Sequence, residues 1–376
     1  MSIPGTKTGF PPEAYEGIIK NFIESLSSGK MTLGPYTQNF EERVAQRVNV
    51  RRAVACSSST AALEMALKVI GVKGKKVLLS ALSNPFSVKA VKDSGGIPVL
   101  CDVGFDGFLS TVSVRELLAD GSVAVAILSY VGIMPNSGLD VIVDVCKEQG
   151  VLVIEDASHC FGATRQEKAA GSFGDIGCFS FSEDMPIQCG SGGMLVTNNE
   201  DWADKAEKMR DLDIVHNLKN VQEPEGSDWR ITEAQAIMGI SQVMWADDII
   251  KARQGACALL GKHYEESSLR SKHVHLLVNT EVGGIYYKYM MMLPDGVDKE
   301  SVCKYMSSRG VEMAADACLN PVHMYFPNDG AVDASTVTGA KRFASQHICL
   351  PFYADMSDAE AYTIMHRLEE AVRACR

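Results

Sequence analysis

The sequence has no apolar run near the ~20 residues that a membrane-spanning helix requires. Its first residues, Met1–Lys7, lack the apolar core of a secretory signal peptide. Positive charge is also scarce, because 36 Lys and Arg face 47 Asp and Glu, for a net charge of −11. We therefore expect neither a membrane nor a nucleic acid among the partners, and a cytoplasmic protein.

The eleven cysteines show no metal-ligand spacing, and the chain has no internal repeat and no low-complexity tract. An odd, unpatterned set of cysteines indicates reduced thiols, so we predict no metal site. What the chain does have is length and apolar content. Its 376 residues, 46% of them hydrophobic, suffice for two globular domains.

Short β-rich runs alternate with helical patterns in the first part of the chain. Several runs are apolar throughout, as in parallel strands that are covered on both faces. The predicted strands are Lys76–Ser80, Pro98–Asp102, Val123–Ser129, Val151–Glu155 and Met194–Thr197. A helix between them would begin at Ser59 or Thr60 as N-cap and bury Leu63 and Leu67. This alternation predicts an α/β sheet domain.

The pattern changes near residue 250. A long helix is predicted over Asp247–Tyr264 and a strand over Ile285–Leu293, and two further helical segments close the chain. We therefore predict a large domain over residues 1–250 and a smaller C-terminal α/β domain over residues 251–376.

The most informative segment is VLVIEDASHCFG, at Val151–Gly162, followed by GSFGDIGCFSFSEDMPIQCGSGG, at Gly171–Gly193. It closely resembles the DegT/StrS-type sugar aminotransferases, which are pyridoxal phosphate (PLP) enzymes of fold-type I. The family's second segment resembles SFGDIGCFSFHPTKNITTGEGG, and its lysine forms the Schiff base with PLP. Aligned without gaps, this chain has Met185 at that lysine. A thioether can neither form an imine nor carry a proton, so the ordinary mechanism is not expected.

The resemblance extends over nearly the whole chain. Four further segments are similar to the family's TxGPxxxxFE, AVAVSSGTAAL, YRMSEIQAAIG and SLPLYP motifs, namely Leu33–Glu42, Ala53–Leu63, Trp229–Gly239 and Cys349–Tyr353. The resemblance implies the fold-type I architecture, with a mostly parallel seven-stranded sheet in the large domain and a small α/β domain. It also implies a homodimer whose two chains share each active site.

Three cofactor contacts of the family are retained. Asp156 matches the carboxylate that pairs with the pyridine nitrogen, and Ser180 matches a serine that contacts the phosphate. Thr60 falls in the loop whose N–H groups surround the phosphate at a helix N-terminus. The alternative for each residue is a local structural role, such as capping a turn or a helix.

Other contacts are altered. Ser59 replaces a glycine of the phosphate loop, Asn84 an aromatic residue that stacks on the ring, and His159 a glutamine beside the ring. Asp228 replaces an asparagine that reaches the phosphate from the neighbouring subunit. A carboxylate within ~4–6 Å of a phosphate disfavours binding unless it is protonated or paired.

We therefore hypothesise a repurposed enzyme that works without a cofactor. His159 would be the acid/base, Asp156 its orienting partner and Asp228 a second carboxylate from the dimer partner. Ser180 and Thr60 would hold an anionic or hydroxylated group of a small polar metabolite. Dehydration, isomerisation, cyclisation or condensation in sugar or natural-product biosynthesis would fit. Alternatively, His159 only hydrogen-bonds the backbone in the core.

Two other hypotheses remain. In one, PLP or its amine form PMP binds non-covalently through Asp156 and Ser180. In the other, the chain is a non-catalytic subunit in a heterodimer with a true aminotransferase, to which it lends Asp228 or Arg230.

Other reactive side chains have ordinary alternatives. Cys189 is a possible nucleophile, but a buried inert thiol is the commoner case. Lys288, beside Tyr287 on the small-domain strand, could offer a displaced amine, as could Lys89 or Lys168. Solvated lysines are the commoner case for these three.

Overall fold

The computed structural model describes residues 2–135, 138–211, 226–278, 284–315, 321–326 and 337–375. Its larger part contains a seven-stranded sheet in the order β1-β9-β8-β5-β4-β2-β3. The strands are β1 (Arg52–Cys56), β2 (Lys76–Ser80), β3 (Ile97–Cys101), β4 (Val123–Ser129), β5 (Leu152–Asp156), β8 (Ile176–Ser180) and β9 (Gly193–Thr197). Only β9 is antiparallel to its neighbours, which confirms the mostly parallel seven-stranded sheet.

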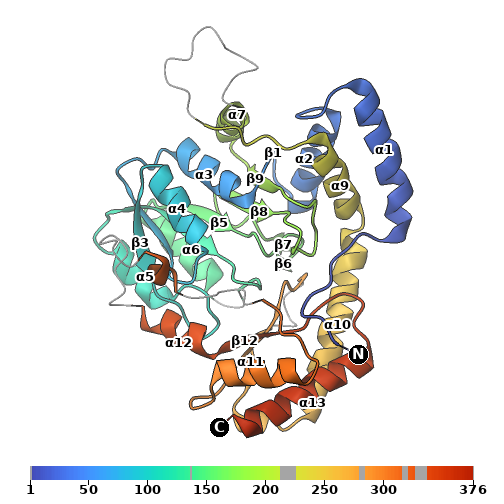
Figure 1. Cartoon of the computed structure of the whole chain (residues 1–376). Coiled ribbons are helices and arrows are strands. Elements are labelled where there is room, and N and C mark those ends of the chain that lie inside the picture. Colours follow the sequence, from blue (N-terminus) through green and yellow to red (C-terminus); the bar gives the residue numbers. More distant parts are fainter. Residues whose placement is uncertain are drawn as a thin grey trace.

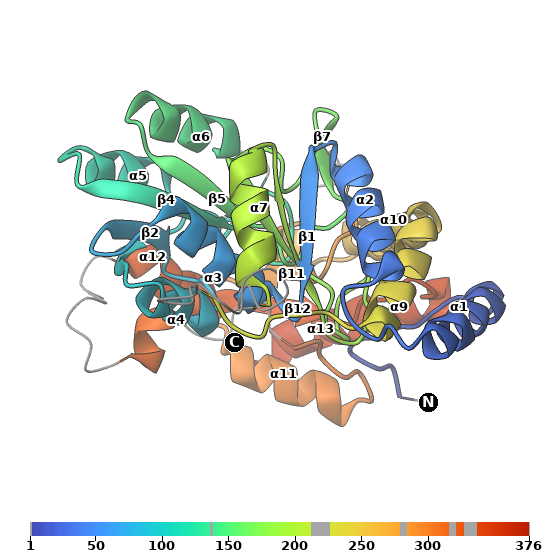
Figure 2. The same cartoon turned by 90° about the horizontal axis from the view of Figure 1, so that it is seen from above.

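Helices cover both faces of this sheet, as Figures 1 and 2 show. One face packs against α2 (Pro35–Val48), α5 (Thr111–Leu118), α6 (Leu139–Glu148) and α9 (Glu233–Met244). The other packs against α3 (Ser59–Ile70), α4 (Pro85–Asp93) and α7 (Glu200–Met209). In β4, Ala126 and Leu128 enter the first core, whereas Val125 and Ile127 enter the second. Two buried faces explain why these strands are apolar at every position.

The smaller part is built on an antiparallel sheet of β10 (His275–Leu276), β11 (Tyr289–Met292) and β12 (His347–Leu350). Its core includes residues of α10 (Ala246–Glu266), α11 (Lys299–Ser308) and α13 (Asp358–Ala374), and α12 (Thr338–Gln346) precedes β12. Ile3, near the start of the chain, pairs with Val311 in this part. The domain boundary at residue 250 remains a prediction, and it falls inside α10.

The remaining elements are short or peripheral. They are η1 (Pro12–Ala14), α1 (Tyr15–Ser28), β6 (Thr164–Arg165), β7 (Lys168–Ala169), η2 (Arg270–Lys272) and η3 (Val322–Tyr325). In Figure 1, α1 lies at the edge of the molecule beside α9. No helix in the described part of the chain is both long and apolar enough to cross a membrane.

Several predicted elements differ in detail. The strand predicted over Ile285–Leu293 is confined to Tyr289–Met292, because the backbone just before it bonds to a helix instead of a strand. Three helices, α11, α12 and α13, lie in the C-terminal part, where two were predicted. The cap of α3 is Ser58, whose Oγ accepts from the N–H of Ala61 at 3.2 Å, and not Ser59 or Thr60.

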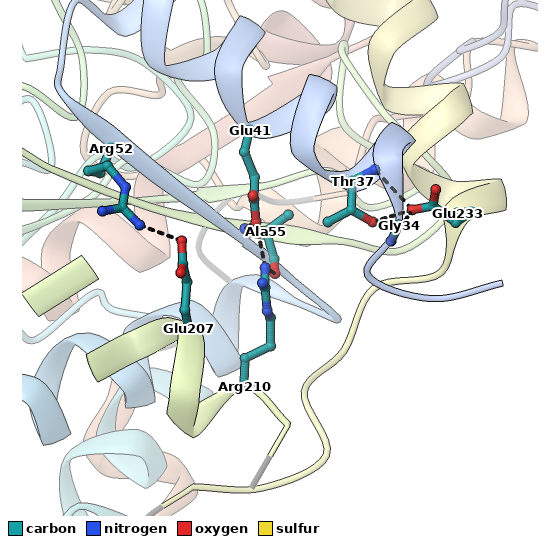
Figure 3. Close-up of polar contacts among 8 residues, drawn as sticks. All are labelled: Gly34, Thr37, Glu41, Arg52, Ala55, Glu207, Arg210 and Glu233. Carbon is teal, nitrogen blue, oxygen red and sulfur yellow. Dashed lines mark hydrogen bonds and ion pairs between the residues drawn. The ribbon is translucent and has the colours of Figure 1, made fainter. Parts of the chain in front are cut away.

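A buried carboxylate fastens α2 to α9. Glu233, fully buried at the start of α9, accepts hydrogen bonds from the N–H groups of Gly34, Tyr36 and Thr37 at 2.9–3.0 Å. It also accepts from the Thr37 hydroxyl at 2.5 Å, as Figure 3 shows. A Cβ on Gly34 would lie 2.6 Å from Glu233 Oε2, so this approach requires glycine. The bonds satisfy the otherwise unpaired first N–H groups of α2.

A second polar contact joins α2, β1 and the end of α7. Arg210, which is buried, donates to the carbonyl of Ala55 at 2.9 Å and forms an ion pair with Glu41 (Figure 3). Glu41 in turn accepts from the N–H of Ala55 at 2.8 Å. Burial raises the pKa of Glu41, and the charge of Arg210 opposes this rise only in part. This buried charge therefore depends on Arg210 for its compensation.

Candidate functional site

Two predicted site residues, Asp156 and Ser180, lie at the carboxyl edge of the large sheet. Asp156 ends β5, Ser180 ends β8, and Gly193 at the start of β9 pairs with both Ser180 and Cys56. The chain runs from Cys56 directly into α3, so the helix N-terminus lies at the same edge. Ligands of open α/β sheets bind at this edge.

The start of α3 forms a cradle for an anion. Because Ser58 and not Ser59 caps the helix, the N–H groups of Ser59 and Thr60 have no protein acceptor within the described residues. A Cβ on Gly193 would lie 2.1 Å from the Ser58 carbonyl oxygen, so only glycine lets β9 pass beneath this loop. Two open N–H groups at the positive end of a 12-residue helix suit a phosphate.

The loop before α3 is held from the other side of the cleft. The N–H of Ser57 donates to the Trp229 carbonyl at 2.8 Å, and the Ser191 hydroxyl donates to the Ser57 carbonyl at 3.0 Å. Gln235 Nε2 donates to the Ser191 carbonyl at 2.8 Å. These bonds fix the cradle to Ser191, to the segment that precedes α9 and to the first turn of α9.

Asp228 lies beside this loop but does not meet the other predicted acid/base residues within the chain. Its carboxylate accepts two hydrogen bonds from Arg230, at 2.8 and 2.9 Å, and its side chain is 63% exposed. The hydrogen bond and charge of Arg230 lower the pKa of Asp228. Since its charge is paired, the predicted repulsion of a phosphate is weakened. A role across a dimer interface remains a prediction.

Asp156 retains the capacity to accept a further hydrogen bond. Ser158 Oγ donates to Asp156 Oδ1 at 2.6 Å, and Ser87 Oγ on α4 donates to Oδ2 at 3.4 Å. The N–H of Ser158 also donates to Oδ1, at 3.4 Å. An ionised carboxylate offers about four acceptor positions, so these three donors leave room for a ring N–H. Asp156 makes no hydrogen bond to His159, so the predicted orienting contact is not formed.

Asn84 and Met185 hold structural positions. Asn84 is exposed and caps α4, its Oδ1 accepting from the N–H of Phe86 at 3.0 Å. Met185 is 6% exposed, and its N–H donates to the Ser182 carbonyl at 3.0 Å in the turn after β8. Ser180 Oγ lies 2.8 Å from Ser182 Oγ. The site therefore keeps its hydroxyls but has no amine at position 185.

His159 contacts both parts of the molecule. Its Nδ1 accepts from the N–H of Gly132 at 3.1 Å, so the hydrogen of the neutral ring is on Nε2. The ring stacks on Tyr287, with the centroids 4.3 Å apart and the planes 16° apart. Burial lowers the pKa of His159, and the nearby carboxylates of Asp156 and Asp184 only partly offset this. The predicted alternative, a bond to backbone, is therefore present.

The lowered pKa of His159 predicts a pH-dependent stability. As pH falls below the unfolded-state value of about 6.5, the unfolded chain takes up a proton before the folded chain does. The contribution of the neutral ring is complete above that value and is lost as pH falls through the folded pKa. In His159→Gln, the melting temperature should fall less between about pH 7 and pH 5. The exposed His366→Gln should keep the wild-type slope; equal slopes in all three proteins would contradict the prediction.

Two residues at the site were not singled out from the sequence. Asp184 Oδ2 accepts from the Tyr287 hydroxyl at 2.7 Å. Arg253, buried on α10, donates to the carbonyls of Ile285, Tyr286 and Tyr287 at 2.7–3.1 Å. Asp184 directly precedes Met185, which was an available signal. Arg253 gave none, because an arginine in a long helix is usually solvated.

The other candidate reactive residues differ in their burial and in their partners. Cys189 is fully buried, and burial raises the pKa of its thiol to about 12, so it is an inert core thiol. Lys89 is exposed and paired with Asp93. Lys288 is only 2% exposed, with Nζ 4.4 Å from the centroid of the Tyr287 ring, which contradicts the solvated alternative.

Comparison with known proteins gives consistent matches. The sequence profile of the DegT/DnrJ/EryC1/StrS aminotransferase family matches residues 12–369. The chain is 26% identical to GDP-perosamine synthase of Caulobacter vibrioides over 345 residues, 91% of each protein. It is 22% identical to UDP-4-amino-4,6-dideoxy-N-acetyl-beta-L-altrosamine transaminase of Helicobacter pylori over 354 residues, 92% of each.

The fold also matches solved structures. Spr1654 of Streptococcus pneumoniae, described as a sugar aminotransferase and solved in a PMP form, matches with a TM-score of 0.87. The identity is 19%, and the match covers 100% of this chain and 98% of that one. At this identity the likeness shows the fold.

These matches correct the expectation that the cleft works without a cofactor, which is wrong. The matched profile is that of an aminotransferase family, and Spr1654 is known in both PMP and PLP forms. The expectation rested on Met185 together with the altered residues Ser59, Asn84, His159 and Asp228. The retained residues Asp156 and Ser180 both end strands at the carboxyl edge of the sheet. A profile match over nearly the whole length means that the chain belongs to the DegT/DnrJ/EryC1/StrS aminotransferase family.

Proposed function

We propose that this protein binds PMP or PLP without a covalent bond and uses it in amino-group or dehydration chemistry on a nucleotide-linked sugar. One observation carries the proposal. The cleft combines a carboxylate that can accept a ring N–H with an open helix N-terminus, yet position 185 has no amine. Asp156 would bind the cofactor's ring and the start of α3 its phosphate, whereas position 185 has no lysine for a covalent bond.

The residues present fit the cofactor. Asp156 would accept from the ring nitrogen, and the N–H groups of Ser59 and Thr60, with the Ser180 hydroxyl, would bind the phosphate. The bound cofactor would supply an electron sink. The glycine-dependent passage of Gly193 beneath Ser58 supports this fit, because it opens the cradle without any side chain in it.

Other residues of the site would orient the bound molecule and limit the access of water to it. Burial lowers the pKa of His159 and its Nδ1 accepts from the Gly132 N–H, so His159 would act as a donor through Nε2 and not as a base. Met185 is 6% exposed, so its side chain would help to keep water from the turn after β8. Arg230 pairs with Asp228, so the charge of Asp228 would oppose a nearby phosphate less. Binding and orientation of the cofactor would thus not require a lysine at position 185.

The substrate class is proposed from the relatives. Two are named for GDP-perosamine and for a UDP-linked dideoxy amino sugar. We propose a nucleotide-linked amino or keto sugar as the substrate, and a homodimer as the working form. Incubating the PLP-loaded protein with GDP-perosamine and following PMP formation by chromatography tests the amino-transfer part directly.

Cofactor binding is the decisive test. Calorimetric titration of the purified protein with PMP should show one saturable site per chain. After PLP loading and borohydride treatment, mass spectrometry should find the unmodified mass, because position 185 has no amine. Absence of binding up to millimolar PMP would refute the proposal.

A covalent anchor should be restorable. In Met185→Lys, PLP and borohydride should give a stable adduct on the peptide that contains residue 185. The reason is that the lysine would start from the same turn beside the cradle. Met185→Leu, which keeps an apolar side chain of similar volume, should give none. An adduct in the leucine variant, or on another peptide of the lysine variant, would contradict the placement of the cofactor.

A further inference from the structure

A carboxylate and a phenol meet next to the position of the missing lysine. Asp184 precedes Met185 in the turn after β8 and has an exposed side chain. Its Oδ2 accepts from the hydroxyl of Tyr287 at 2.7 Å. Because Tyr287 belongs to the smaller part of the molecule, this hydrogen bond crosses the cleft. It fixes a carboxylate one residue before position 185, where the family has its lysine.

Tyr287 is held in place on three sides. Its N–H donates to the Gly132 carbonyl at 3.1 Å, its carbonyl accepts from Arg253 Nη2 at 3.1 Å, and its ring stacks on His159. The preceding residue, Tyr286, has a φ of +43°, a conformation that costs free energy for a side-chain-bearing residue. Arg253 stabilises it with bonds of 2.7 and 3.0 Å to its carbonyl. Such over-determined geometry is typical of functional sites.

The neighbouring groups are poorer candidates for a base. His159 has its Nδ1 lone pair engaged by Gly132 and carries a hydrogen on Nε2. Met185 has no titratable group. Lys288 is only 2% exposed, and its Nζ lies 4.4 Å from the centroid of the Tyr287 ring. Of these side chains, Asp184 alone is a carboxylate and is exposed.

We infer that Asp184, oriented by Tyr287, is the proton acceptor that replaces the family's lysine; this rests on the proposed function. The C–H bond on the carbon next to the cofactor would break, and the proton would pass to an Asp184 oxygen. The electron pair would move into the cofactor ring. Asp184 is exposed, so its proton would exchange with solvent before a proton returns to carbon at the end of the step. No other oxidant or reductant is required, because one proton leaves and one returns. Tyr287 is a positioning residue.

Burial and the adjacent carboxylate raise the pKa of Tyr287 well above its usual range. The Tyr287 hydroxyl therefore remains protonated at every working pH and fixes Oδ2 of Asp184 by its hydrogen bond. The other oxygen of Asp184 would accept the proton from the substrate. Tyr287→Phe removes this fixed donor, so it should lower the rate of proton transfer by Asp184 more than it lowers the affinity for PMP.

The first experiment separates binding from proton transfer. PMP affinity is measured by calorimetry for the wild type, Asp184→Asn, Tyr287→Phe and the matched control Glu183→Gln, an adjacent exposed carboxylate. Exchange of the carbon-bound hydrogen of the GDP-perosamine amine carbon is then followed by NMR in D2O with PLP-loaded protein. Asp184→Asn should keep PMP affinity within about threefold and lose at least about 100-fold in exchange rate. Glu183→Gln should change neither.

A second readout uses the protein without cofactor. The carboxylate of Asp184 raises the pKa of His159, so Asp184→Asn should lower the His159 pKa measured by NMR titration of labelled histidine. An unchanged His159 pKa would place Asp184 outside the cleft and overturn the inference. Unchanged exchange in Asp184→Asn, or a borohydride-trapped adduct on Lys288, would also overturn it. Failure of the wild type to bind PMP would instead refute the proposed function.

Discussion

Replacing Asp156 with asparagine is expected to raise the Kd for PMP about 10- to 100-fold. A hydrogen bond to a charged group contributes about 1.5–3 kcal/mol, which corresponds to this range. The amide that replaces the carboxylate keeps the shape but loses the charge that favours a protonated ring nitrogen. Its contacts with Ser158 and Ser87 can persist, so the fold is expected to be intact. Calorimetric titration with PMP measures the effect.

Asp175→Asn is the matched control for this variant. Asp175 lies just before β8 and accepts from the N–H of Val153 on β5 at 2.8 Å, at the opposite end of the same strand pair. It is an aspartate fixed to the same sheet but remote from the carboxyl edge. Its variant should bind PMP as the wild type does. Equal losses in both variants would indicate general damage to the sheet and would remove Asp156 from the proposed site.

Arg210→Met is expected to lower the free energy of unfolding by about 3–5 kcal/mol, because it leaves the buried carboxylate of Glu41 without its partner. The carbonyl of Ala55 loses a donor in the same variant. Urea unfolding followed by circular dichroism measures the loss. Removing both charges in Arg210→Met with Glu41→Leu should recover most of it, since a buried pair replaced by apolar residues is often neutral.

Arg52→Met provides the comparison. Figure 3 shows Arg52 paired with Glu207. Arg52 also bonds to Asp204, and its side chain is 31% exposed. Partly exposed ion pairs contribute about 0–1 kcal/mol, so this variant should unfold close to the wild type. Similar losses for Arg52→Met and Arg210→Met would show that burial does not decide the cost here.

The large domain was predictable because its signals are local. Strands buried on both faces are apolar at each position, and β2 and β4 have the predicted bounds. Strands β1 and β8 were not assigned, although they lie within the quoted motifs, because glycine and serine interrupt or follow their short apolar runs. In the small domain, Ile285–Lys288 has the composition of a strand. Its carbonyl groups accept hydrogen bonds from the Arg253 side chain instead of from a neighbouring strand. That contact joins distant parts of the chain and has no local signature.

The site was predictable in part for a similar reason. Asp156 and Ser180 end strands, so their place at the sheet edge follows from the order of elements. The partner of His159 did not follow, because Gly132 contributes a backbone N–H, which every residue type offers alike. The pairing of Asp184 with Tyr287 depends on how the two sheets approach each other. Such contacts between distant segments are the part that composition and spacing do not encode.

The stack of His159 on Tyr287 has a mechanical consequence. One ring belongs to the large sheet's loops and the other to a segment clamped by Arg253 to α10. A rotation of the small sheet away from the large one would therefore separate the two rings and break the Tyr287–Asp184 hydrogen bond. The same rotation would expose the imidazole to water. Because burial is what lowers the pKa of His159, this exposure would raise that pKa. The protonation state of His159 would therefore report whether the two parts of the molecule are in contact.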